Sequence, residues 1–315
     1  MQFTTPVPVQ KANRQIDYDS AIFSVGSCFA INISEKFAHY QFKSDVNPFG
    51  ILFHPVAIAQ HFDRAVLEIA FYEDDIFYHQ ERWHAYDAHS DLSNSDKDAL
   101  ISELNSAAKN TRLKLQSASH VIVTLGTSWV YRHRAENKFV ANCHKLPQAD
   151  FNKELLSVEV VAESVLNTIQ SVHSVNPDAQ IIFTISPVRH LKDGFVENQM
   201  SKANLISGLH QAMKGVSNVS YFPSYEIMMD ELRDYRFYAS DMIHPNQLAI
   251  DYIWEKFADS FFSAETRETA ARVGDIRKAQ NHRPFNAESS AHQQFLSDLR
   301  KKIDALQSKH PHFEF

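Results

Sequence analysis

Short runs of apolar residues alternate along the chain with longer stretches in which apolar residues recur every three to four positions. The runs are typical of strands buried on both faces of a sheet, and they occupy residues 21–25, 41–46, 120–125, 180–185 and 218–222. The longer stretches predict amphipathic helices, at residues 29–40, 55–70, 95–117, 155–174 and 198–214. This alternation predicts an α/β fold with three layers, α/β/α, around about five parallel strands.

A polar or glycine-bearing turn follows each predicted strand. In a parallel sheet the ligand site lies beyond the carboxyl ends of the strands. We therefore expect the site to be built from five loops, at residues 26–27, 47–50, 126–129, 186–190 and 223–225.

Three further segments lie outside this alternation. Residues 71–95 and 131–151 have the character of insertions into the domain that spans residues 1–264. Residues 265–315 are mostly polar, with a loop near 277–288, and end in a helical pattern of Phe295, Leu299, Ile303 and Leu306. We expect a C-terminal helical extension that either packs back on the domain or mediates a homo-oligomer.

Ser27 is the first candidate for chemistry. It follows the run AIFSV and Gly26, which permits a tight exit from a strand, and it precedes the helix predicted at 29–40. A hydroxyl at that turn would lie beside the unpaired amides at the helix N-terminus, which stabilise a developing oxyanion. The sequence Gly-Ser after a strand is also common as a simple turn.

Asp241 and His244 are the second candidate. They stand just before Pro245 and the apolar-periodic stretch NQLAIDYIWEKFADSFF, which predicts a helix with Pro245 in its first turn. On one loop, the carboxylate could hold the imidazole in a single tautomer. Asp-x-x-His before a helix is also common as an N-cap with an exposed histidine. Together, Ser27, His244 and Asp241 have the residue types of a nucleophile, a base and the group that orients the base.

Composition excludes several classes of protein. The 31 basic and 38 acidic residues give a net charge of −7, which disfavours nucleic-acid binding. We find no apolar stretch of about 18 residues for a membrane span and no secretory signal, and the only two cysteines are Cys28 and Cys143. These features predict a cytoplasmic protein that does not bind membranes.

The 17 histidines do not show the spacing of a metal site, and neither a Gly-x-Gly-x-x-Gly nor a Walker-type loop occurs. We therefore expect no metal and no cofactor.

Six blocks resemble the GSCFA family. They are GSCFA at 26–30, NPFGILFHP at 47–55, TLGTSWVY at 124–131, ANCHKLP at 141–147, TISPVRHLKDG at 184–194 and FYASDMIHPN at 237–246. That family is similar to the SGNH or GDSL-type hydrolases. The resemblance implies a flavodoxin-like three-layer fold and cleavage of esters, often of acyl groups on carbohydrates.

The resemblance also implies roles for residues. Ser27 matches the nucleophile, Asp241 and His244 match the catalytic Asp-x-x-His pair, and Gly50 matches an oxyanion-hole glycine. After the third strand the superfamily has Gly-x-Asn-Asp, whereas this chain has Gly126, Thr127, Ser128 and Trp129.

Other donors could replace the missing asparagine. The candidates are a side chain from 126–128 or Asn142, and the neighbouring His144 either lines the pocket or belongs to an ordinary polar loop. Arg189 should face the same cleft, where it could bind a carboxylate or orient a loop.

Two classes of function remain open. The first is an acyl-ester hydrolase or acyltransferase that takes a small-molecule or glycan ester; here Ser27 is the nucleophile, with the Cys28 thiolate as the alternative. The second is a binding protein for a carbohydrate or acylated ligand that has lost turnover, as the missing asparagine suggests.

Overall fold

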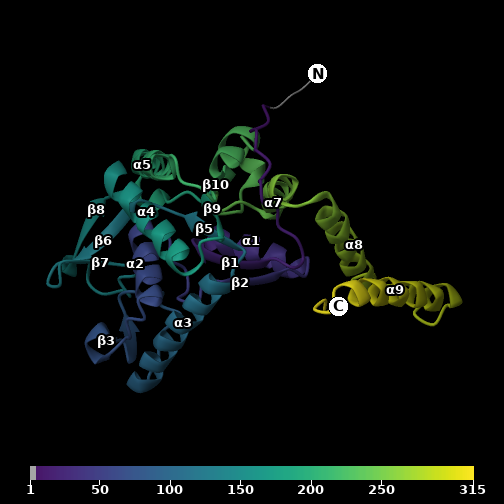
Figure 1. Cartoon of the computed structure of the whole chain (residues 1–315), viewed down its shortest axis with the longest axis horizontal. Coiled ribbons are helices and arrows are strands. Elements are labelled where there is room, and N and C mark those ends of the chain that lie inside the picture. The colour runs from purple at the N-terminus through teal and green to yellow at the C-terminus, as the bar shows by residue number, and fades with distance from the viewer. Residues whose placement is uncertain (1–4) are drawn as a thin grey trace.

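The computed structural model describes residues 5–315 and is built around one parallel sheet (Figure 1). All five predicted strands are present, and their order across the sheet is β10-β9-β5-β1-β2. Their bounds are β1 (Ala21–Gly26), β2 (Lys43–Val46), β5 (His120–Leu125), β9 (Gln180–Ile185) and β10 (Val219–Phe222).

This strand order is that of a flavodoxin-like sheet, so the expected fold class is confirmed. The chain passes from β1 outward to β2 and then returns to the other side of β1 for β5. The crossovers therefore reverse direction between β1 and β5, where sheets of this order bind ligands.

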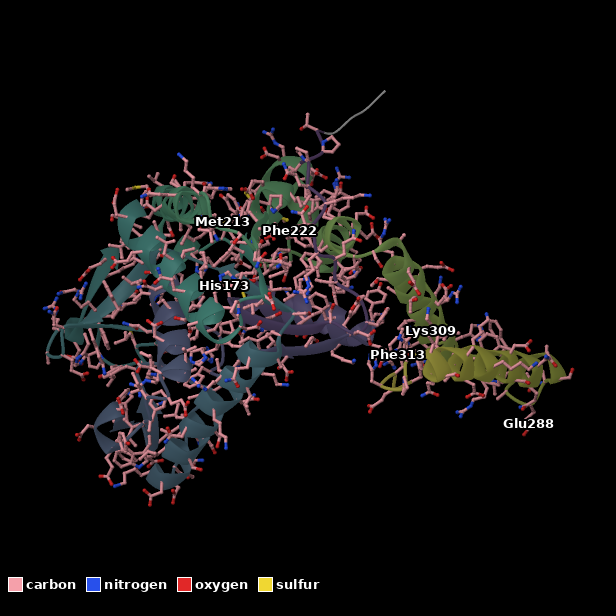
Figure 2. All side chains as sticks on the ribbon, in the orientation of Figure 1. His173, Met213, Phe222, Glu288, Lys309 and Phe313 are labelled. Carbon is pink, nitrogen blue, oxygen red and sulfur yellow. The ribbon has the colours of Figure 1, made fainter. Side chains whose placement is uncertain are left out.

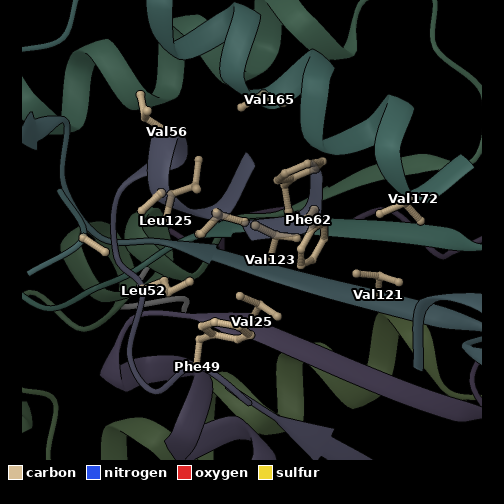
Figure 3. Close-up of a cluster of buried hydrophobic side chains, with 14 of the residues drawn as sticks. Val25, Phe49, Leu52, Val56, Phe62, Val121, Val123, Leu125, Val165 and Val172 are labelled. Carbon is tan, nitrogen blue, oxygen red and sulfur yellow. The ribbon is translucent and has the colours of Figure 1, made fainter. Parts of the chain in front are cut away.

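Helices cover both faces of the sheet, because alternate residues of each buried strand point to opposite sides. Phe23, Val121 and Phe183 lie in one apolar core with four helices, part of which Figure 3 shows. Ile22 and Ile122 lie in a second core on the opposite face, to which two helices of the domain and the helices of the C-terminal extension contribute. The first four helices are α2 (Pro55–Val66), α3 (Lys97–Ser117), α4 (Val158–Val175) and α5 (Phe195–Met213), and the other two are α1 (Cys28–His39) and α7 (Gln247–Phe261).

Each insertion forms a small antiparallel sheet of its own. The first contains β3 (Ile76–His79) and β4 (Arg82–Ala85), and the second has the order β7-β6-β8. The second sheet extends beyond the predicted insertion, with β6 (Trp129–His133), β7 (Lys138–Val140) and β8 (Phe151–Leu155). Short helical turns lie at Glu73–Asp75, Gln148–Asp150, Leu191–Asp193, Ser224–Glu226, Ile227–Glu231 and Tyr235–Phe237.

Helix α7 begins later than predicted. Its N-cap is Asn246, whose side chain accepts from the Ala249 amide, so Pro245 lies before the helix and not in its first turn. Pro245 instead forms an isolated bridge with Tyr238. The loop that carries Asp241 and His244 therefore lies outside helix α7.

The C-terminal extension contains two helices where one was predicted. These are α8 (Ala264–Gln280) and α9 (Ser290–Lys309), and they extend from the sheet as an arm (Figure 1). The loop predicted at 277–288 starts only after Gln280. Leu299, Ile303 and Leu306 are buried as their spacing suggests, whereas 37% of Phe295 is exposed.

The end of the chain returns from the arm to the domain. Glu288 marks the outer tip of the arm in Figure 2, and Phe313 lies at its inner end. There the amide of Glu314 donates to Oε1 of Gln41 at 2.9 Å, and Gln41 Nε2 donates to the carbonyl of Glu314 at 2.7 Å. Phe313 is 1% exposed against Tyr18. Within residues 5–315, no helix is long and apolar enough to cross a membrane.

Candidate active site

Ser27 stands at the carboxyl end of β1 and is the N-cap of α1. Gly26 takes a φ of +146° to make the turn, and a Cβ on Gly26 would lie 2.2 Å from the carbonyl oxygen of Thr124. Only glycine fits that backbone and that gap. The close approach of β1 to β5 therefore fixes Ser27 at the point where the crossovers reverse.

The Ser27 hydroxyl does not cap its helix. Three other helices begin on a serine N-cap, and Ser157, Ser263 and Ser289 each accept from an amide in the first turn, as N-caps do. Ser27 makes no such bond, and its Oγ, which is buried, has no hydrogen-bond partner among the residues described. Buried polar atoms in folded proteins are nearly always bonded, so the simple turn interpretation leaves this hydroxyl unexplained.

Asp241 and His244 form the predicted pair. Nδ1 of His244 lies 2.6 Å from Oδ2 of Asp241, and Oδ1 of Asp241 accepts from the amides of Ile243 and His244 at 2.9 and 3.0 Å. These bonds, the two amides first, lower the pKa of Asp241 to about 2. Asp241 is therefore ionised at neutral pH and holds the proton of His244 on Nδ1, so that Nε2 is left as the basic nitrogen.

Arg189 anchors the loop of this pair to the sheet. It follows β9, its amide donates to the carbonyl of Ile243 at 3.3 Å, and its guanidinium donates to the carbonyl of Met242. The same guanidinium lies 4.3 Å from the ring centre of Tyr238. Of the two roles predicted for Arg189, these contacts correspond to orienting a loop.

Ser27 and His244 are not hydrogen-bonded to each other in this structure. Ser27 follows β1 and the His244 loop is anchored beside β9, so one strand, β5, separates them at a spacing of about 4.8 Å per strand. The His244 side chain is 46% exposed. Catalytic hydrogen bonds are often long in unliganded proteins and tighten when substrate binds.

The expected oxyanion donors are already engaged. The amide of Ser27 donates to the Thr124 carbonyl at 3.1 Å, and the amide of Gly50 donates to the Asn47 carbonyl at 2.8 Å. The hydroxyl of Thr127 lies 2.8 Å from Oγ of Ser201, and that of Ser128 donates to the Ser201 carbonyl at 3.0 Å. In this structure, turn closure and the packing of α5 therefore use these groups.

The structure does not bring the three other predicted residues, Gly126, His144 and Asn142, together beside Ser27. Gly126 lies against Ser27, since a Cβ on Gly126 would be 3.3 Å from Cβ of Ser27. His144 is buried among the insertions, where its nitrogens contact Ser90 Oγ at 3.2 Å and the Ala85 carbonyl at 2.8 Å. Both nitrogens are used there, so the ring has no capacity left for substrate. Asn142 lines a pocket beside β6 and accepts from the His144 amide at 2.8 Å.

Asn47 is a donor that sequence reasoning overlooked. Its Oδ1 accepts from the Gly26 amide at 2.8 Å, which leaves Nδ2 pointing away from that amide. Nδ2 is buried and lacks a partner within the described chain. An unused amide group thus adjoins the turn that carries Ser27. The family block NPFG contains Asn47, but only the bond from the Gly26 amide to Oδ1 shows that Nδ2 is the free atom.

Lys202 is the second overlooked residue. It is 1% exposed, and its Nζ donates to the carbonyls of Gly126 and Ser186 at 2.7 Å each. These carbonyls follow β5 and β9, so the ammonium joins the two loops between Ser27 and His244. Burial lowers the pKa of Lys202 to about 7, although the nearby Cys28 thiol raises it. In the sequence, Lys202 shares a helical face with Leu205 and Leu209, an unusual place for a lysine.

His190 stands between the two halves of the site. Its pKa is lowered to about 4, first by burial, then by the charge of Lys202, with a smaller contribution from His244. Nε2 of His190 is buried without a partner inside residues 5–315. This histidine is neutral at pH 7 and is the rival of His244 as a base.

The buried charge of Lys202 predicts a pH dependence of stability. Its pKa in the folded protein, about 7, is below the unfolded value of 10.5. The unfolded chain keeps the proton to higher pH, so stability rises between about pH 7 and pH 10. We expect the free energy of unfolding of the wild type, relative to Lys202→Met, to increase by about 2 kcal/mol from pH 7 to pH 9. Urea unfolding at both pH values measures this, and identical pH profiles for the two proteins would contradict it.

The Cys28 thiol is not activated. Burial raises its pKa, and the amides of Phe29 and Cys28, together with Lys202, only partly offset this. The lowered pKa suggested for a thiolate at a helix N-terminus is therefore not found. Among the residues that the structure covers, no group of three or more His, Cys, Asp or Glu side chains could hold a metal ion.

Comparisons with known proteins give a family and several distant structures, including two esterases. An acetyl xylan esterase (Est2A) from the rumen bacterium Butyrivibrio proteoclasticus aligns with 81% of this chain at 12% identity and a TM-score of 0.39. The chain spans 64% of the length of that esterase. A family 3 carbohydrate esterase from Clostridium thermocellum aligns with 76% of this chain and 94% of its own length, at 11% identity and a TM-score of 0.34.

Both structures are too distant to bear on activity, and no curated protein matches the sequence. Two family models do match, one described as the GSCFA family over residues 21–257 and one as the C-terminal domain of GSCFA proteins over residues 273–315. The chain therefore belongs to the GSCFA family.

Proposed function

We propose that this protein is a serine esterase that cleaves acyl esters of small or carbohydrate-linked alcohols. One observation carries the proposal: Ser27 is an N-cap whose buried hydroxyl is left free, at the same sheet edge as an imidazole held by a carboxylate. A free hydroxyl, a base and a group that orients the base are the parts that acyl transfer needs.

The proposed reaction has two steps. Ser27 Oγ attacks the ester carbonyl carbon while His244 Nε2 takes the hydroxyl proton, and Asp241 stabilises the imidazolium. The bond to the alcohol then breaks, and the alcohol leaves with that proton. Water gives a proton to His244 and attacks the acyl-enzyme, which releases the acid and restores Ser27. An acyl acceptor in place of water would make the same site a transferase.

Asn47 is the proposed donor to the oxyanion. Its free Nδ2 adjoins the Ser27 turn, and the N-terminus of α1 adds the positive end of its helix dipole. Two features of this chain thus replace the asparagine that is missing after Gly126. Lys202, buried behind β5 and β9, adds a positive charge near the developing negative charge when it is protonated, which its pKa of about 7 favours only below neutral pH.

Hydrolysis of p-nitrophenyl acetate tests the proposal. Ser27→Ala is expected to lower kcat by at least about 10³-fold. Ser24→Ala is the matched control, since Ser24 is also buried in β1 with an unpaired hydroxyl but lies before the turn. Its rate should stay within about threefold of the wild type. Equal rates for all three proteins would remove the esterase proposal.

The second candidate is a binding protein for an acylated ligand. The observation in its favour is that Ser27 and His244 make no hydrogen bond to each other in this structure. It predicts that an acylated carbohydrate raises the melting temperature while p-nitrophenyl acetate is not hydrolysed. Hydrolysis that depends on Ser27 would exclude it.

A further inference from the structure

A pocket of about 310 Å³ adjoins the site and has no role in the reaction described above. One wall is the loop before α2, with Phe53 and His54, and the other is the small sheet of β6, β7 and β8. Most of its lining is apolar or aromatic, and includes Val130, Tyr131, Val140 and Phe151. The pocket therefore belongs to the second insertion and not to the parallel sheet.

Gly126 connects this pocket with Ser27. A Cβ built on Gly126 would lie 3.0 Å from Cβ of Phe53 and 3.3 Å from Cβ of Ser27. The Phe53 carbonyl also accepts from the Gly126 amide at 2.7 Å. Ser27 and the pocket wall thus meet across one residue without a side chain. From Ser27, an acyl chain would pass Gly126 to reach Phe53 and the pocket.

The side chains that line the pocket indicate which kind of group it can bind. Its lining contains no carboxylate, and its lysine, Lys145, is exposed at the mouth. The buried His54 is neutral, because burial lowers its pKa to about 4, and its nitrogens contact the Ala57 amide and the Val140 carbonyl at 3.1 Å each. The lining therefore offers no ionised partner within the pocket and only a few polar side chains, among them Asn142 and Gln148, so its mostly apolar surface suits a hydrocarbon chain better than a charged group.

We propose that this pocket takes the acyl chain of the substrate, so that the preferred ester carries a linear chain of about eight to ten carbons rather than an acetyl group. The length follows from the volume, since about ten groups of the ~30 Å³ that a water molecule occupies fill it. This inference rests on the proposed esterase activity, because the chain enters the pocket from an acyl group on Ser27.

A series of p-nitrophenyl esters from acetyl to decanoyl tests the inference on the full chain. We expect kcat/KM to rise about threefold for each added methylene up to about eight carbons. Cys143→Trp fills part of the pocket and should lower the ratio of kcat/KM for octanoyl over acetyl by about tenfold. Hydrolysis with no preference for chain length would overturn the acyl pocket and leave the esterase standing.

Cys143 also gives a readout that does not need turnover. It lines the pocket, whereas the other cysteine, Cys28, begins α1. Sodium octanoate should slow the modification of Cys143 by methyl methanethiosulfonate at least threefold, while acetate should not, with each cysteine followed by peptide mass spectrometry. If octanoate protected Cys143 but no ester were hydrolysed, the pocket would be supported as a binding site for the chain and the proposed esterase activity would be contradicted. Equal rates with octanoate and acetate, or protection by a neutral sugar instead, would overturn the pocket.

Discussion

Replacement of His244 by alanine is expected to lower kcat for ester hydrolysis by about 10⁴- to 10⁶-fold. Nδ1 of His244 is held by the Asp241 carboxylate, 2.6 Å away, at the sheet edge that carries Ser27. Without the ring, no group accepts the Ser27 proton. Asp241→Asn should keep the loop but lose the charge that orients and stabilises the imidazolium, at a cost of about 10²- to 10⁴-fold. Steady-state kinetics with p-nitrophenyl acetate measures both variants.

His190→Gln is the matched control for His244. His190 lies at the same edge with an unpaired Nε2, but its pKa of about 4 makes it a weak base. Its replacement should leave kcat within about tenfold of the wild type. If His190→Gln abolished hydrolysis while His244→Ala retained it, His190 would be the base and the assignment of His244 would be contradicted.

Asn47→Asp is expected to lower kcat by about 10²- to 10³-fold with little change in KM. Aspartate keeps the oxygen that accepts from the Gly26 amide, so the turn should remain intact. It replaces the free Nδ2 by an oxygen, which removes a donor from the oxyanion and adds a negative charge. We would measure kcat and the melting temperature of the variant and of the wild type. A lower kcat at an unchanged melting temperature would show that the donor was lost and that the fold was kept.

Asn142→Asp is the control for Asn47. Asn142 was the asparagine that the sequence suggested as a replacement for the one missing after Gly126. Its Oδ1 accepts from the His144 amide, and an aspartate could make the same bond. We expect kcat of this variant for p-nitrophenyl acetate, whose acetyl group is too short to fill the pocket that Asn142 lines, to stay within about fivefold of the wild type. The opposite pattern, a large loss for Asn142→Asp and none for Asn47→Asp, would move the donor to the insertion loop.

The sequence was sufficient to predict the parallel sheet, because its central strands are short apolar runs and its helices are amphipathic, although the edge strand β2, KSDV, is mostly polar. It was insufficient for β8, whose residues FNKEL are mostly polar, and for α8, whose residues are too polar to show a buried stripe. Both elements depend on contacts with other parts of the chain, β8 through its pairing with β6 and α8 through its packing against α9.

The candidate site was predictable only in part. Ser27, Asp241 and His244 stand out because their residue types and turns are local features of the sequence. The donors do not, since the bonds that Ser128 and Asn47 make join segments that are far apart in the sequence. Lys202 is likewise placed at the site only by its hydrogen bonds to the carbonyls of Gly126 and Ser186, which the sequence does not reveal.

The most direct test is to expose the wild-type protein to a fluorophosphonate and to locate the adduct by mass spectrometry of the intact chain and its peptides. A serine activated by His244 should give one adduct per chain on Ser27, and His244→Ala should not react. An adduct on Cys28, or no adduct under conditions in which the ester is hydrolysed, would contradict the assignment of Ser27 as the nucleophile.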